Sequence, residues 1–100
     1  YKTFNIPSES SVTLSFAYSA FLLLFSAKGS LGGAQEAWII CAYGNGGTSR
    51  NRIYKLFDAG TRALTYEIVD QTIIITNPNG TTMNCSITFL VGNSSQVTVS

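Results

Sequence analysis

Histidine is absent from this chain of 100 residues. Histidine is the commonest general base and a frequent metal ligand near neutral pH, so its absence excludes Ser-His-Asp and Cys-His catalytic devices. The two cysteines, Cys41 and Cys85, are not the close pair that structural zinc sites use, and no Asp-rich loop suits calcium. The glycine clusters lack the Lys-Ser/Thr that follows a phosphate-binding loop. We therefore predict that the domain is not an enzyme and uses no cofactor or metal.

Charge is also scarce, since charged residues make up 11% of the chain and the net charge is +1, against roughly 25% charged residues in an average soluble domain. Such a chain exerts little attraction on nucleic acids or anionic membranes. The longest apolar run, residues 20–25, is far shorter than the roughly 20 residues that span a bilayer. We expect neither a nucleic-acid partner nor membrane insertion.

Carboxylates are few enough to consider individually. They stand at expected strand ends, in turns or at exposed positions of alternating segments, and they are Glu9, Glu36, Asp58, Glu67 and Asp70. A glycosidase needs only two acids, so their number alone does not exclude one. Their positions predict that all five are solvated surface groups.

No segment of useful length repeats its apolar residues at the helical period. Apolar residues instead alternate with polar ones or run together in short blocks, as is typical of β-strands. Strands are expected at residues 3–6, 11–16, 20–27, 36–43, 50–57, 64–68, 71–76, 83–91 and 97–99. The continuous apolar segments 20–27 and 36–43 are expected to be central, and the first of them to be buried on both faces. Pro7 places the first strand at a sheet edge.

Turn signals separate these segments at roughly ten-residue intervals, most clearly in Gly44-Asn45-Gly46-Gly47 and Asn77-Pro78-Asn79-Gly80. The second of these predicts a hairpin between the segments 71–76 and 83–91. Eight or nine short strands so spaced indicate an all-β fold: an antiparallel, two-sheet, jelly-roll-like β-sandwich, with a closed β-barrel as the alternative. Residues 1–100 are expected to form a single domain. Because the chain starts at Tyr1 and not at Met, we expect it to be excised from a larger protein.

Cys41 and Cys85 both lie in apolar strand segments, which favours two buried, reduced thiols over a disulfide bridge. Trp38 precedes Cys41 instead of standing between the two cysteines, so the immunoglobulin pattern is not met. The apolar neighbours of Trp38 predict a place in the core or at a subunit interface rather than a sugar-stacking platform.

The segment from Tyr43 to Lys55 is the strongest candidate for recognition. It joins aromatic residues and cations around a flexible Gly/Asn loop, and its candidate ligand-binding residues are Tyr43, Asn45, Arg50, Asn51, Arg52 and Tyr54. Arginine and tyrosine are enriched at interfaces, and amides and aromatic rings suit sugars. The alternative is that Arg50 and Lys55 only keep an apolar strand soluble.

Two stretches resemble the small C-terminal, receptor-binding β-sandwich domains of tailed-bacteriophage tail fibres and other virion structural proteins. The first runs from Ile6-Pro7-Ser8 to Phe16, and the second joins Gln71–Asn77 to Ser86–Val91. The likeness is one of pattern and spans nearly the whole chain. It implies a virion protein, often trimeric, that attaches to a glycan or protein of a bacterial surface.

Two other functions remain open at this point. One is a purely structural assembly or decoration domain of a virion, and the other is a secreted or cell-surface bacterial adhesin or carbohydrate-binding module. Exposed strand faces that carry few charged residues risk edge pairing unless another surface covers them. We therefore expect a homo-oligomer, and a trimer in particular.

Overall fold

The computed structural model describes residues 1–17, 19–30, 35–44, 50–59 and 63–100. Nearly all of its regular structure is strand. The strands are β1 (Lys2–Ile6), β2 (Ser10–Phe16), β3 (Ala20–Gly29), β4 (Gln35–Tyr43), β5 (Arg52–Ala59), β6 (Thr65–Val69), β7 (Thr72–Asn77), β8 (Met83–Val91) and β9 (Val97–Val99). One turn of 3-10 helix, η2 (Ser94–Gln96), precedes β9.

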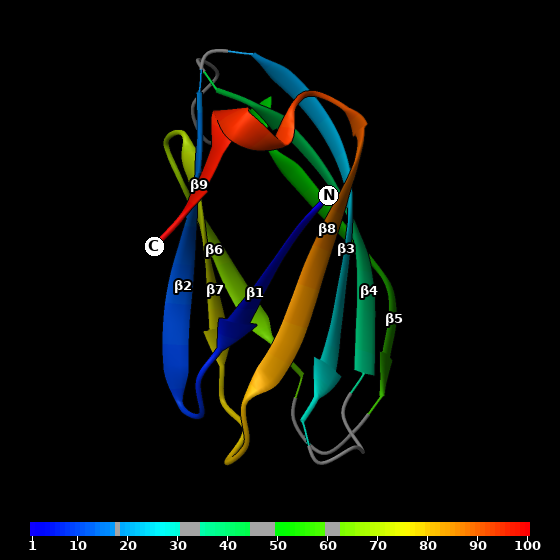
Figure 1. Cartoon of the computed structure of the whole chain (residues 1–100), viewed down its shortest axis with the longest axis vertical. Coiled ribbons are helices and arrows are strands. Elements are labelled where there is room, and N and C mark those ends of the chain that lie inside the picture. Colours follow the sequence, from blue (N-terminus) through cyan, green and yellow to red (C-terminus); the bar gives the residue numbers. More distant parts are fainter. Residues whose placement is uncertain (18, 31–34, 45–49, 60–62) are drawn as a thin grey trace.

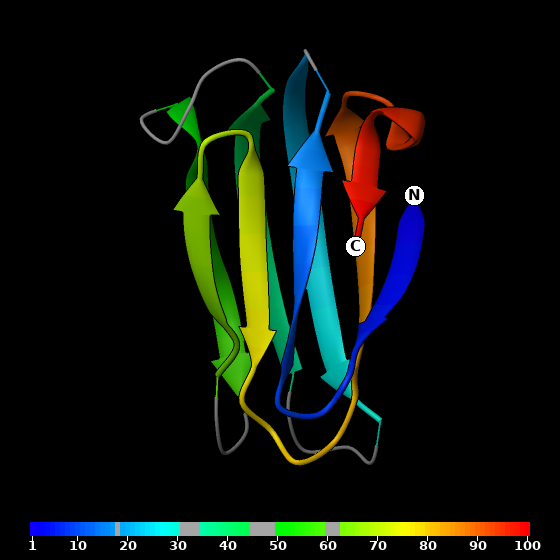
Figure 2. The same ribbon diagram turned by 90° about the vertical axis from the view of Figure 1, so that its left-hand side faces the viewer.

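The strands form two antiparallel sheets that face each other as two layers (Figures 1 and 2). The five-stranded sheet has the order β1-β8-β3-β4-β5, and the four-stranded sheet has the order β6-β7-β2-β9. Pairing of β1 with β8 and of β2 with β7 wraps the two ends of the chain around each other, as in a jelly roll. The predicted β-sandwich is confirmed. The alternative barrel is not, because the sheets remain separate and keep open edges.

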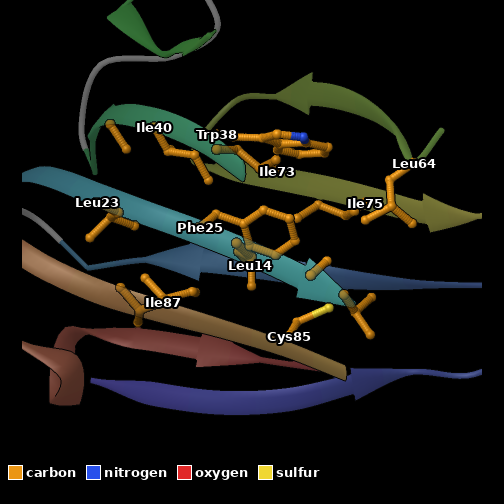
Figure 3. Packing of buried hydrophobic residues seen from close by; sticks show 14 of the residues in the cluster. Leu14, Leu23, Phe25, Trp38, Ile40, Leu64, Ile73, Ile75, Cys85 and Ile87 are labelled. Carbon is orange, nitrogen blue, oxygen red and sulfur yellow. The ribbon is translucent and has the colours of Figure 1, made fainter. Parts of the chain in front are cut away.

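The core fills the space between the layers with the inward side chains of both sheets (Figure 3). Trp38 is fully buried at its centre, with its ring centroid 4.7 Å from that of Phe25 and 5.6 Å, edge-on, from that of Tyr66. Removing one large apolar side chain of this kind from water contributes about 1.5–3 kcal/mol to folding. The prediction that Trp38 belongs to the core is confirmed.

The two apolar segments form interior strands, since β3 lies between β8 and β4, and β4 lies between β3 and β5. β1 occupies an edge, as Pro7 predicted. The expectation that residues 20–27 are buried on both faces is wrong. Burial alternates along β3, and Leu24 on the outer face is 39% exposed. The reason is that the second sheet covers only one face of the first.

Asn77 organises the turn that the sequence predicted at residues 77–80. Its side chain is fully buried, and its Nδ2 donates to the carbonyl oxygens of Ile6 and Thr81 at 3.0 and 2.9 Å. Its Oδ1 accepts from the backbone N–H of Asn79 at 2.9 Å. One amide therefore ties the end of β1 to the β7–β8 loop, and that loop runs on to residue 82.

Candidate binding surface

The outer face of the five-stranded sheet carries aliphatic side chains at one end. In the strand register Leu22 pairs with Cys41 and Val91, and Leu24 pairs with Ile39. Leu24 and Val91 are 39% and 52% exposed. We call Leu22, Leu24, Ile39, Cys41 and Val91 the apolar face. Contiguous apolar side chains on an exposed sheet usually mark a site of interaction with another molecule.

Four of the predicted site residues border the apolar face along the end of β4 and the start of β5. Arg52 pairs with Cys41 and Tyr54 pairs with Ile39, so both stand beside aliphatic side chains. The guanidinium of Arg50 lies 5.7 Å from the ring centroid of Tyr43 in a cation–π contact. We call Tyr43, Arg50, Arg52 and Tyr54 the tyrosine–arginine strip. These residue types are the ones that most often anchor protein interfaces.

The predicted site also included two asparagines, Asn45 and Asn51. Asn45 lies outside the described residues. Asn51 is only 1% exposed, and its Oδ1 accepts from the backbone N–H of Tyr43 at 2.9 Å while its Nδ2 donates to the carbonyl of Asp70 at 3.0 Å. Its amide thus joins the two sheets, so a ligand would meet the strip and not Asn51. The same bonds explain why β5 begins at Arg52, two residues later than predicted.

The outer face of the four-stranded sheet has a different character. Small hydroxyl side chains dominate it, namely Ser11, Thr13, Ser15, Thr72 and Thr76. The Oγ of Ser11 and the Oγ1 of Thr76 are 2.6 Å apart and hydrogen-bonded. Water hydrates such a face readily. The outer faces of the two sheets therefore differ, and the apolar face belongs to the five-stranded sheet.

A buried carboxylate stands at the crossing from one sheet to the other. Glu36 is 2% exposed and accepts from the indole Nε1 of Trp38 at 3.0 Å and from the backbone N–H of Leu64. The ammonium of Lys55 lies 3.3 Å from Oε1 of Glu36 and also donates to the carbonyl of Leu64. Glu36 and Lys55 together therefore hold the chain where it leaves the five-stranded sheet for β6.

The expectation that every carboxylate is solvated is wrong for Glu36. Its side chain points to the same face as Trp38, two residues later in β4, and that face is the interior. The alternation of β4 carried this signal, because a residue two positions from a core tryptophan shares its side of the sheet. The expected strand at 64–68 likewise begins one residue later, since the N–H of Leu64 is taken by Glu36.

The two cysteines lie on opposite faces of the five-stranded sheet. Both are free thiols; Cys41 is half-buried on the apolar face, while Cys85 is buried in the core. The prediction of two buried thiols is therefore correct only for Cys85. Removal from water, reinforced by the nearby Glu36 carboxylate, raises the pKa of Cys85 to about 12. The Cys85 thiol is accordingly protonated and unreactive at neutral pH.

In the described part of the chain, no three acidic or cysteine side chains converge as a metal site would require. The arrangement can offer a partner apolar contact area, aromatic rings and guanidinium groups.

Comparison with known proteins identifies no relative of this chain. No protein-family model, no curated protein and no solved structure matches it. Among the described residues, no helix is long and apolar enough to cross a membrane.

Proposed function

We propose that this domain is a non-catalytic attachment module of a virion fibre or related surface assembly. In this proposal the apolar face packs against further copies of the domain, and the tyrosine–arginine strip meets a molecule of the host surface. The carrying observation is the apolar face itself, in which Leu24 and Val91 are 39% and 52% exposed, beside Tyr54 of the strip at 55% exposure.

The charge distribution favours a second copy of the domain as the molecule that covers the apolar face. The apolar face carries no ionisable side chain except the thiol of Cys41, so two copies can approach without like-charge repulsion. The cation Arg52 stands at its border, beside Cys41, where the rim of such an interface would lie. Polar or charged groups at the rim and apolar groups at the centre are the usual anatomy of an interface.

The oligomeric state in solution tests this part of the proposal. Leu24→Lys places a charge in the centre of the apolar face, whereas Ile74→Lys places the same charge on the outer face of the four-stranded sheet. Light scattering should find a trimer for the wild type and for Ile74→Lys, and a monomer for Leu24→Lys. A wild type that stays monomeric at high concentration would contradict the packing and favour a single-copy adhesin module.

Attachment is tested separately, with fluorescently labelled protein and a panel of intact bacterial cells. Arg52→Ala and Tyr54→Ala should each weaken binding to a recognised strain while leaving the oligomeric state unchanged. The matched control is Thr65→Ala, an exposed position on β6 in the other sheet. Failure to bind any strain would favour a purely structural role within the virion.

A further inference from the structure

A polar groove lies at the end of the five-stranded sheet opposite the tyrosine–arginine strip. It encloses about 390 Å³ across β1, β8, β3 and β4, within the range of about 300–1,000 Å³ typical of small-molecule sites. Two cross-strand rows of side chains line it. One row is Thr3, Ser86 and Ser26, and the other is Asn5, Asn84, Lys28 and Gln35.

The asparagines of this groove conflict with the local preference of a strand. Asparagine is depleted in strands, yet Asn5 and Asn84 lie within β1 and β8, each one residue from a strand end, and directly face each other. The outer face of the four-stranded sheet is also hydrophilic, but its polar residues are mainly serine and threonine, which suit strands better than asparagine does. Where a sequence departs from its local preference without a structural gain, a functional reason is expected.

The amide groups of this row are not used by the fold. Within the described part of the chain, the hydrogen bond between side chains inside the groove joins Ser26 Oγ and Ser86 Oγ at 2.8 Å. The amides of Asn5, Asn84 and Gln35 form no bond to another described residue, and all three side chains are exposed. Each amide offers both donors and an acceptor. The groove therefore presents an ordered array of unengaged hydrogen-bonding groups.

An aromatic side chain stands at the edge of the same array. Phe57 of β5 pairs with Ala37, which continues the row of Thr3, Ser86 and Ser26, and the phenyl ring is 51% exposed. Ala37, a small residue, stands between Phe57 and Ser26 in this row. A flat apolar ring next to neutral hydrogen-bonding groups matches the two surfaces of a pyranose, its C–H face and its hydroxyl edge.

We infer that this groove binds a short saccharide that carries few charged groups. Neighbouring strands are about 4.8 Å apart, so four strands present an array about 14 Å long, the scale of a short oligosaccharide. Lys28 is the single charged side chain exposed in the two rows, which disfavours nucleic acids and polyanions.

This inference specifies the class of ligand for a domain proposed to attach to surfaces, but it uses a site separate from the tyrosine–arginine strip. The saccharide site in the groove and the attachment role of the strip can be disproved independently of each other. Loss of cell binding in Arg52→Ala bears on the strip, whereas saccharide binding in the groove is measured on the purified domain alone.

The test is a glycan array of neutral and singly acidic oligosaccharides, followed by ¹⁵N–¹H NMR titration with the best-bound saccharide. Resonances of Asn5, Ser26, Asn84 and Ser86 should shift. The double variant Asn5→Thr/Asn84→Thr should bind about tenfold or more weakly, although threonine suits strands better and should keep or raise the melting temperature. Ile74→Thr, the matched exchange on the other sheet, should bind as the wild type does.

Three results would overturn the inference. The first is an array on which the wild type binds no saccharide more strongly than the double variant does, and the second is a saccharide that shifts resonances of the strip instead of the groove. Equal affinity of the double variant and the wild type would also exclude the groove. Because the variant is expected to fold, weaker binding with an unchanged melting temperature identifies a ligand contact and not a loss of structure.

Discussion

The two faces of the five-stranded sheet are built from similar residue types and have different roles. On β4 the inward side chains include Trp38 and Ile40, which are fully buried, whereas the outward ones include Ile39 and Cys41, which are only partly covered. The inner face is covered by the second sheet, and nothing in the described part of the chain covers the outer face. Hydrophobic content alone therefore does not separate side chains that are buried in the core from side chains that stay partly exposed on the outer face.

The largest expected effect lies on the inner face, at Glu36. Glu36→Ala leaves the indole N–H of Trp38 and the backbone N–H of Leu64 without an acceptor and removes the partner of Lys55. Loss of one member of such a buried group should lower the free energy of unfolding by about 3–5 kcal/mol. Urea unfolding measures this loss.

The adjacent residue gives the control. Gln35→Ala changes an exposed side chain on the outer face of the same strand and should alter stability by about 0.5 kcal/mol or less. Equal losses of unfolding free energy in Glu36→Ala and Gln35→Ala would contradict the role of Glu36 in holding the chain where it passes from one sheet to the other.

Two neighbouring isoleucines of β4 compare the faces directly. Ile40→Ala creates a cavity in the core and should cost about 2–5 kcal/mol, whereas Ile39→Ala trims a partly exposed side chain and should cost about 1 kcal/mol. Urea unfolding in the Leu24→Lys background, expected to be monomeric, isolates the contribution of the single domain.

The same pair also reports on self-association. If copies pack through the apolar face, the cost of Ile39→Ala should grow with protein concentration when Leu24 is retained, since the interface then adds to stability. The cost of Ile40→Ala should not change. A cost at Ile39 that is independent of concentration would argue against that interface.

The sequence predicted the fold well because alternation and turn residues are local. Val12, Leu14 and Phe16 alternate with hydroxyl residues and do face the core, and a turn does lie at Asn77-Pro78-Asn79-Gly80. The hairpin expected there is wrong, because β7 and β8 belong to different sheets and the loop crosses from one to the other. Failure came where the pattern is continuous. A run such as residues 20–25 is apolar on both sides, and only the layer count of the finished fold decides which side remains exposed.

The candidate site was predictable in part. The tyrosine–arginine strip is continuous in sequence around one turn, so its members could be named, although Asn51 could not be recognised as buried from that turn alone. The polar groove is assembled from four strands, and β1 and β8 are far apart in the chain. Asn5 and Asn84 become neighbours only through the strand register, which residue types do not specify.

Alkaline pH should lower the free energy of unfolding by about 2 kcal/mol through ionisation of the buried Cys85 thiol. The pKa of Cys85 is raised from 9.0 to about 12, so the folded state keeps the proton that the unfolded state loses. The stabilising contribution is therefore complete below pH 9 and is lost as the pH rises toward 12. By about pH 10.5 the loss should be near 2 kcal/mol.

The variant Cys85→Ala isolates this effect from the titration of lysines and tyrosines. It should be less stable than the wild type at neutral pH, because a buried atom is removed, but its free energy of unfolding should fall less steeply above pH 9. Urea unfolding at several alkaline pH values gives both slopes. Parallel slopes would show that the Cys85 thiol ionises as easily in the folded state as in the unfolded one.

The smallest expected effect, a change of a few-fold in labelling rate, reports on the outer face without any substitution in the core. Iodoacetamide should alkylate Cys41 in the folded protein and reach Cys85 only after unfolding, since the core thiol is both covered and protonated. Cys41 belongs to the apolar face, so its alkylation should slow as protein concentration rises and copies associate. In Leu24→Lys the rate should not depend on concentration, because association is blocked. A wild-type rate that is equally insensitive would place Cys41, and with it the apolar face, outside any contact between copies.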